Sequence, residues 1–327
     1  MKNKPNFINL LFLLTLLGVS CTGKTENKSK ISVADTVNIP LQKHKKALDF
    51  FIISDWGWNG YNQQQEVADG MTILADSIEP KFIVSCGDNF QVQGVASTQD
   101  PLWLTSFENV YKHLSLQVDW YPVLGNHDYR GNTQAEIDYS KISRRWKLDS
   151  HYYTFARKIN DSISARLIFL DTPPLVDEYY KKPGYPDVFK QDSAKQMVWL
   201  KDVLANSKEQ WKLVFGHHPV YSASNKHGNT PELIKRLKPL FEKYHVQFYI
   251  CGHDHDMQHL MEKGKTVNYI VTGVGGEPRP ANSNELSVFS KSVPGFSMIS
   301  LFADSLQFYF IDSKGNAVYT IKKNYKE

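Results

Sequence analysis

Cysteine, clustered positive charge and repetition are all scarce in this sequence. Its 327 residues include three cysteines and carry a formal net charge of +4 at pH 7. No long basic block with interleaved aromatic residues occurs, so the charge pattern of a nucleic-acid-binding protein is excluded and no nucleic-acid partner is expected. No internal repeat or low-complexity tract is visible, which excludes repeat architectures. A chain of 327 residues can hold one large domain or two ordinary ones, and a hydrophobic fraction of 41% allows a sizeable core.

The three cysteines fall in two settings. Cys21 follows an apolar N-terminal segment, whereas Cys86 and Cys251 lie at the ends of predicted strands, two residues before Asp88 and His253 respectively. A disulfide between the latter two requires neighbouring strands, and we favour the alternative that both are buried free thiols.

The N-terminal segment predicts export. Residues 7–19 are almost wholly apolar and follow two lysines, but the run is too short and too early for a stop-transfer helix. Small residues and Cys21 come next, which resembles a bacterial lipoprotein signal, although Gly18 stands where that signal has leucine. An ordinary secretory leader cleaved nearby is the alternative. Either way we expect a protein of the bacterial cell envelope or periplasm, attached to a membrane only through a lipid anchor at Cys21.

A polar, lysine-rich stretch follows and is typical of a flexible spacer. The predicted organisation is a signal peptide (residues 1–20), a flexible linker (21–46) and one domain (47–327).

Within that domain, apolar runs of strand length alternate with amphipathic segments of helical period. Alternating units of this kind followed by further strands predict an α/β sandwich with helices outside. Strands are predicted over 47–54, 81–86, 120–124, 152–156, 165–170, 211–215 and 247–251, with more after 267, and helices over 62–78, 101–114, 133–146, 191–204 and 230–244.

Five short polar motifs each follow one of these strands. Because the carboxyl ends of parallel strands meet at one edge of a sheet, residues far apart in sequence can converge there. The motifs offer two carboxylates, one amide and three imidazoles, a ligand set for two metal ions that share one bridging aspartate. They are Asp55-Trp56-Gly57, Gly87-Asp88-Asn89, Gly125-Asn126-His127-Asp128, Gly216-His217 and Gly252-His253-Asp254-His255.

These motifs resemble those of the binuclear metallophosphoesterases, and within them the mammalian-type (tartrate-resistant) purple acid phosphatases. Residues 139–146, 216–222 and 273–276 extend the likeness beyond the ligands, and it covers about residues 49–323. The resemblance implies a four-layer α/β/β/α sandwich of two mixed β-sheets flanked by helices.

The resemblance also implies a role for each ligand. Asp55 and His255 would bind the first metal, and Asp88 would bridge both. The remaining ligands, Asn126, His217 and His253, would hold the second metal. Imidazole and carboxylate suit iron, zinc or manganese, and the absence of cysteine ligands argues against a closed structural zinc site. We expect two metal ions, iron with iron, zinc or manganese.

Two further histidines are implied to face the substrate. His127 follows a ligand and would bind phosphate or protonate the leaving alkoxide. His227 matches a second substrate-pocket histidine, with one extra residue after His217.

The sequence departs from the family pattern near the bridging aspartate. Purple acid phosphatases carry a tyrosine three residues after it, whose phenolate binds ferric iron and gives the colour, but Gln91 stands there in this chain. The first metal therefore loses an anionic ligand. Gln91 could offer its amide oxygen, or water could fill the position.

The implied function is hydrolysis of small phosphate monoesters by a hydroxide that the two metals activate, in a protein that we expect to be a monomer. Two alternatives stay open: a phosphodiesterase of the same superfamily, and a catalytically silent phosphate-binding envelope protein. The loop over residues 277–294, if it covers the site, decides between monoesters and diesters.

Overall fold

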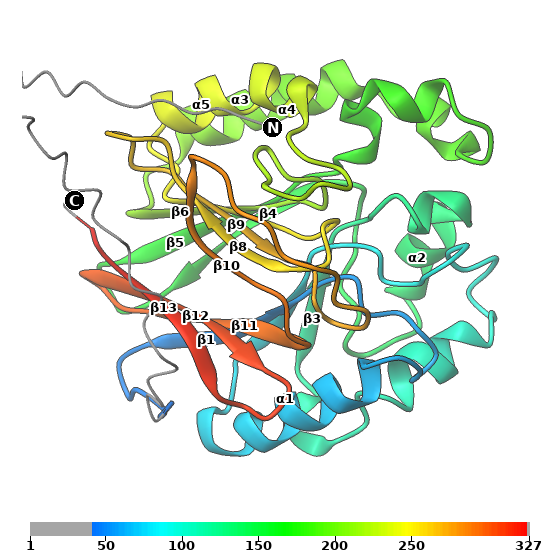
Figure 1. The fold of residues 1–327 in the computed structure, drawn as a ribbon, viewed down its shortest axis with the longest axis horizontal. Coiled ribbons are helices and arrows are strands. Elements are labelled where there is room, and N and C mark those ends of the chain that lie inside the picture. Colours follow the sequence, from blue (N-terminus) through cyan, green and yellow to red (C-terminus); the bar gives the residue numbers. More distant parts are fainter. Residues whose placement is uncertain (1–40, 326–327) are drawn as a thin grey trace, which may run out of the picture. The chain divides into compact units, whose positions relative to one another are not determined.

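Two β-sheets lie at the centre of residues 41–325, the part of the chain that this computed structural model describes (Figure 1). The first sheet has the order β13-β12-β11-β1-β2-β3, in which β1, β2 and β3 are parallel and the other pairings are antiparallel. Its strands are β1 (Leu48–Ile53), β2 (Phe82–Ser85), β3 (Asp119–Pro122), β11 (Gly295–Leu301), β12 (Ser305–Asp312) and β13 (Ala317–Asn324).

The second sheet has the order β10-β8-β9-β7-β6-β5-β4, in which β9, β7, β6 and β5 are parallel and the outer pairings are antiparallel. Its strands are β4 (Tyr153–Lys158), β5 (Ser164–Phe169), β6 (Trp211–Phe215), β7 (Phe248–Cys251), β8 (Met257–Leu260), β9 (Asn268–Thr272) and β10 (Ser287–Lys291).

Helices cover the outer faces of both sheets (Figure 1). One buried cluster joins α1 to the first sheet, and another joins the helices after β5 to the second sheet. The helices are α1 (Gln64–Ile78), α2 (Thr133–Tyr139), α3 (Ser193–Asn206), α4 (Pro231–Arg236) and α5 (Lys238–Lys243), with a π-helical turn at Trp103–Glu108. Short 3₁₀ turns occupy Leu114–Leu116, Asp128–Arg130, Pro173–Leu175, Asp177–Tyr180 and Pro186–Lys190.

Side-chain alternation along β1 shows how the layers form. Phe50 and Ile52 lie in the cluster between the two sheets, together with Phe215 of β6, whereas Phe51 and Ile53 pack in the cluster that holds α1. Successive side chains of a strand point to opposite faces, so a strand covered on both sides is apolar throughout. The predicted sandwich of two mixed sheets flanked by helices is confirmed.

Three predicted helices are shorter than their periodicity suggested or are divided. The segment 101–114 forms only the π-helical turn Trp103–Glu108, which ends where the N–H of Asn109 donates to the carbonyl of Leu104. The segment 230–244 divides into α4 and α5, because Pro239 has no N–H to donate to residue 235 and its ring crowds that carbonyl. Helix α2 ends at Tyr139 instead of residue 146. Beyond it the buried guanidinium of Arg145 turns inward, where it donates to the carbonyl of Tyr111 at 2.6 Å and contacts Glu108 at 2.9 Å.

Cys86 and Cys251 are buried free thiols, as favoured from the sequence. Cys86 packs between the sheets and Cys251 on the outer side of the second sheet. The predicted signal peptide, Cys21 and residues 21–40 of the predicted linker lie outside the described residues. Within residues 41–325, no helix combines the length and the apolar character that crossing a membrane requires.

Candidate metal centre

All six predicted metal ligands lie in loops that follow parallel strands. Asp55 follows β1, Asp88 follows β2, and Asn126 lies just beyond β3 in the first sheet. His217 follows β6, and the loop after β7 carries both His253 and His255. The structure brings the six side chains together, as the following contacts show.

The histidine after β6 is the centre of one half of the cluster. His217 donates through Nδ1 to the carbonyl of Cys86 at 3.0 Å, so Nε2 presents a lone pair. Around this Nε2 atom stand Asn126 Oδ1 at 3.1 Å, His253 Nδ1 at 3.2 Å and Asp88 Oδ1 at 3.3 Å. An amide oxygen, a carboxylate oxygen and an imidazole lone pair repel one another unless a cation lies between them. These residues therefore fit a metal ion.

Asp55 and His255 form the other half. His255 donates through Nδ1 to the carbonyl of Glu277 at 2.7 Å, which turns its Nε2 lone pair toward Asp55 Oδ1 at 3.4 Å. That oxygen is buried and has no hydrogen-bond partner, while Oδ2 accepts the backbone N–H of His253 at 3.0 Å. A buried carboxylate oxygen without a donor is costly, so a second cation fits here. One oxygen or nitrogen atom each from Asp55, Asp88 and His217 lie within 4.8 Å of one another, which places Asp88 between the two halves.

The ligand loops are held in strained conformations. Asp55, Asp88 and His253 have φ values of 58°, 47° and 69°, in the left-handed region that non-glycine residues rarely adopt. Such outliers concentrate at functional sites, where the surrounding structure enforces them. The glycines make room for this arrangement: a Cβ atom on Gly125 would lie 2.2 Å from Asp88 Oδ1, and Gly87 has φ of 88°.

His127 lies beside the predicted bridging carboxylate. Its backbone N–H donates to Asp88 Oδ1 at 2.8 Å, and its Nδ1 atom bonds the carbonyl of Val92 at 2.8 Å. Its Nε2 atom lies 3.9 Å from Asp88 Oδ2 and remains available to a substrate. Gln91, in the place of the family tyrosine, is also here and donates through Nε2 to Asp88 Oδ2 at 3.3 Å.

His227 also reaches the centre, despite the extra residue in its loop. Its ring centroid lies 4.1 Å from that of the predicted ligand His253. Burial, together with the nearby positive charges of Lys226 and Arg279, lowers the pKa of His227 to about 4. The ring is therefore neutral near pH 7 and can donate a hydrogen bond without carrying charge.

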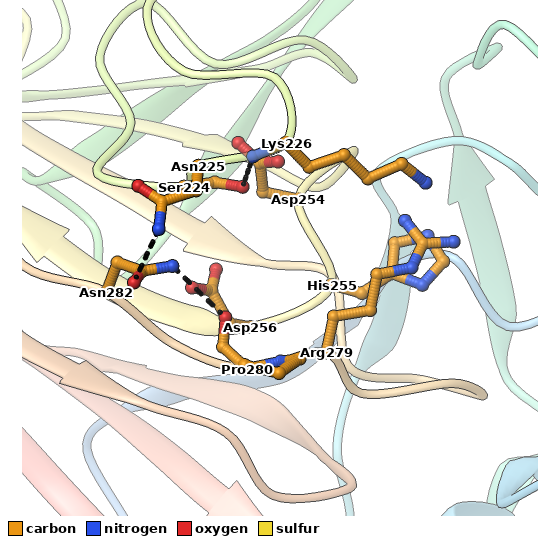
Figure 2. A pocket seen from close by; sticks show the side chains of 9 residues that line it. All are labelled: Ser224, Asn225, Lys226, Asp254, His255, Asp256, Arg279, Pro280 and Asn282. Atoms are coloured by element: carbon orange, nitrogen blue, oxygen red, sulfur yellow. Dashed lines mark hydrogen bonds between the residues drawn. The ribbon is translucent and has the colours of Figure 1, made fainter.

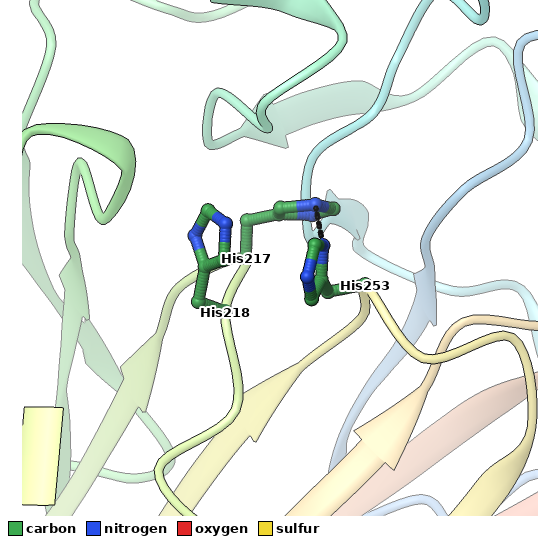
Figure 3. Close-up of side chains that lie close together, drawn as sticks. All are labelled: His217, His218 and His253. Atoms are coloured by element: carbon green, nitrogen blue, oxygen red, sulfur yellow. Dashed lines mark hydrogen bonds between the residues drawn. The ribbon is translucent and has the colours of Figure 1, made fainter. Parts of the chain in front are cut away.

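His218 supports the site without a free nitrogen for a metal. It lies close to His217 and His253 (Figure 3), with one nitrogen of each of the three rings within 4.8 Å. However, Thr172 Oγ1 contacts its Nδ1 at 2.9 Å and Tyr179 Oη contacts its Nε2 at 2.6 Å. The ring centroid of His218 lies 4.4 Å from that of His253, so His218 fixes the orientation of that histidine. No sequence signal marked these two hydroxyls.

Asp128 ties two ligand loops together. Its carboxylate accepts the backbone N–H groups of Gly125, Asn89 and Phe90 at 2.8, 3.1 and 3.0 Å. These residues flank Asp88 and Asn126, so Asp128 holds the two loops in place relative to each other. A second buried acid, Glu136, meets the Nδ2 atom of Asn89 at 3.2 Å. Sequence reasoning missed Glu136, because an acid in the first turn of a helix is usually exposed to solvent.

Glu136→Gln is expected to become more stable relative to wild type as the pH rises. Burial and the charge of Asp128 raise the pKa of Glu136 well above its ordinary value of 4.5. At a pH between the ordinary pKa of the unfolded chain and the raised pKa of the folded chain, Glu136 is protonated only in the folded protein. The stability that this carboxyl contributes at low pH is therefore lost as the pH rises through the folded pKa. Glutamine does not titrate. Melting curves of the variant and wild type should diverge by a few degrees between pH 5 and pH 9. The exposed control Glu285→Gln should show no divergence, and a pH-independent difference for Glu136→Gln would contradict the assignment.

Comparison with known proteins places this centre in a family. The profile of calcineurin-like phosphoesterases matches residues 48–257. Purple acid phosphatase 4 of Arabidopsis thaliana is 35% identical over 284 residues, which cover 84% of this chain and 82% of that protein. Tartrate-resistant acid phosphatase type 5 of Homo sapiens is 33% identical over 294 residues, which cover 84% of this chain and 90% of that protein.

A solved structure agrees with these matches. GAP50, the anchor in the inner membrane complex of Plasmodium, superposes with a TM-score of 0.72 at 26% identity, over 85% of this chain and 89% of that one. The resemblance seen in the motifs is thereby confirmed across most of the chain. The chain belongs to the calcineurin-like phosphoesterase family, and its relatives there include purple acid and tartrate-resistant acid phosphatases.

Proposed function

We propose that this protein is a metal-dependent phosphatase that hydrolyses small phosphate monoesters. Its family and its relatives support metal-dependent hydrolysis of phosphate esters. The observation that carries the proposal is the convergence of acceptor atoms on His217 Nε2, with the unpartnered oxygen of Asp55 close by. Such an arrangement is expected of a dinuclear metal centre and has no purpose in a purely structural loop.

Each half of the centre would hold one ion. Asp55 and His255 would bind the first, Asp88 would bridge, and the second would lie among the other predicted ligands, Asn126, His217 and His253. Two adjacent ions, when bound, activate the attacking water and neutralise charge on the phosphoryl oxygens. The donors suit iron, zinc or manganese.

The chain's own residues orient the reaction. The backbone N–H of His127 fixes Asp88 Oδ1, and the ring of His127, in its protonated form, would pass a proton from Nε2 to the leaving oxygen. The neutral ring of His227 would donate to a phosphoryl oxygen. Tyr179 and Thr172 hold His218 against His253, which keeps the second half of the centre rigid.

Gln91 predicts that the protein is pale when loaded with iron. Its amide cannot supply the charge transfer that a phenolate gives, so we expect no strong visible band. Gln91→Tyr should create a band that reduction removes, because the side chain already meets Asp88 at 3.3 Å. Absorption spectra of the two iron-loaded proteins test this. An intense visible band in wild type would contradict it, and Gln93→Tyr, two residues along the same loop, is the control.

A second candidate is a non-catalytic envelope protein. The Plasmodium structure, 26% identical to this chain, is described as an anchor, so the fold also occurs in a protein with that role.

We propose export with a lipid on Cys21 for both candidates, which cell fractionation of wild type and Cys21→Ser would test. We also propose a monomeric state, which light scattering would test. Metal content and turnover separate the two candidates.

The decisive experiment measures metal content and hydrolysis together. The purified protein is loaded with iron, zinc or manganese and assayed on phenyl phosphate and on diphenyl phosphate. We expect two ions per chain and at least tenfold faster turnover of the monoester, and a chelator should abolish it. Faster turnover of the diester would favour the phosphodiesterase. A fully loaded protein that hydrolyses neither ester would overturn the enzymatic proposal.

A further inference from the structure

A cavity of 320 Å³, whose lining residues are all polar or charged except Pro280, opens beside the metal centre (Figure 2). Its walls come from the loop after β6, the loop after β7 and the loop over residues 277–282. The predicted ligand His255 forms part of the wall, with its Nε2 turned toward Asp55. The cavity therefore adjoins the place where a phosphate ester would be cleaved.

The end of the cavity nearest the metal centre is positively charged. The amino group of Lys226 and the guanidinium of Arg279 stand beside His255 in Figure 2. Two hydrogen bonds hold the loop over residues 277–282 against the predicted metal ligand His255. The N–H of Arg279 donates to the carbonyl of His255 at 2.6 Å, and His255 Nδ1 donates to the carbonyl of Glu277 at 2.7 Å. Glu277 pairs with Arg279 at 3.2 Å and offsets part of its charge, whereas Lys226 has no carboxylate within ion-pair distance among residues 41–325.

The other end presents hydrogen-bond acceptors. Asp254 and Asp256 are each 2% exposed, and each has one buried oxygen without a hydrogen-bond partner. Their other oxygens are occupied, by the hydroxyl of Ser222 and by Gln258 Nε2 at 2.7 Å. Asp254 and Asp256 line the cavity, and carboxylates that lack donors favour a ligand that brings N–H or O–H groups.

We propose that this cavity receives the alcohol portion of the substrate and selects phosphate esters of polyhydroxylated alcohols, such as sugar phosphates. A sugar phosphate is complementary to the cavity: its phosphate would face the positively charged end, and its hydroxyl donors would face the acceptors at the other end. Apart from the imidazole of His255, none of the described lining residues carries an aromatic ring, so the cavity offers no aromatic platform for a nucleobase or an aryl group. The inference rests on the proposed function, because it assigns the leaving group of the same reaction.

The test compares two esters that differ in their hydroxyls and in one ring oxygen. Glucose 6-phosphate and cyclohexylmethyl phosphate share a six-membered ring that bears one CH₂–O–phosphate arm. For the metal-loaded, full-length protein we expect kcat/KM to favour glucose 6-phosphate by about tenfold or more, since sites built to bind hydroxyls discriminate strongly against analogues that lack them. A ratio near one, with both esters hydrolysed, overturns the cavity assignment and leaves the proposed function intact. Hydrolysis of neither ester counts against the proposed function itself.

Asp256→Asn should lower this ratio about tenfold. Gln258 Nε2 holds one oxygen of this side chain at the cavity wall, so the substitution turns the other oxygen, which has no partner, from an acceptor into a donor. Asn282→Ala, which removes an amide at the rim, should lower the ratio about threefold and decides the matter if the first variant does not fold. Asp161→Asn, on an exposed loop between β4 and β5, should change nothing. Unchanged ratios in both cavity variants, or a third metal ion in wild type that is lost from Asp256→Asn, would refute the proposal.

Discussion

Asp88→Asn is expected to lower kcat for phenyl phosphate by on the order of 10³-fold or more, because it removes the anion that two metal ions would share. The side chain is 2% exposed and nearly isosteric in the variant. Its Oδ1 atom can still accept the N–H of His127, but an amide nitrogen would replace Oδ2 and face the donor Nε2 of Gln91. That nitrogen has no lone pair for a cation, so metal content should fall together with activity.

Asp49→Asn is the matched control for this substitution. Asp49 is also a buried carboxylate, 4% exposed, but it lies at the opposite end of β1 from Asp55. Its loss should alter stability and leave both metal content and kcat close to wild type. If Asp88→Asn retained two ions per chain and more than a tenth of the activity, Asp88 would not be the bridge. Circular dichroism of both variants excludes global unfolding as the cause of any loss.

The parts of this site that were predictable from the sequence share one physical cause. Apolar runs of strand length mark β1, β2, β6 and β7, because strands buried on both faces consist mostly of apolar residues. The polar motifs that follow them were recognisable by contrast with the strands. Sheet order was not predictable in this way, since β1 pairs with β11 from the far end of the chain, and hydrogen bonding between strands leaves no local signal.

Side chains that act through tertiary contacts were equally hidden. Tyr179 and Thr172 hold His218, but neither stands near a motif in sequence. Asp254 and Asp256 flank His255, and no sequence pattern assigned either a role. Only the fold shows that both line a cavity and that each has an unpartnered oxygen. The six ligands follow from local pattern and family resemblance, whereas the substrate pocket follows from packing.

His127→Ala is expected to lower kcat by about 10²-fold with both metal ions retained, the size of effect that general acid catalysis supplies. The substitution leaves unchanged the backbone N–H that donates to Asp88 Oδ1. Within the described part of the chain, the lost ring makes one hydrogen bond to the backbone, from Nδ1 to the carbonyl of Val92. The dinuclear centre should therefore keep its shape. What disappears is the Nε2 atom, 3.9 Å from Asp88 Oδ2, that would carry a proton to the leaving oxygen.

Leaving-group dependence separates this role from simple binding. A poor leaving group needs the proton more than a good one, so the loss in His127→Ala should be several-fold larger for ethyl phosphate than for phenyl phosphate. His227→Ala should lower the two rates equally, because a neutral donor to phosphate acts alike on both esters. Equal losses for the two esters in His127→Ala would show that His127 binds phosphate and does not protonate the leaving group. Metal analysis must show two ions per chain in both variants, since loss of an ion would lower both rates without regard to the leaving group.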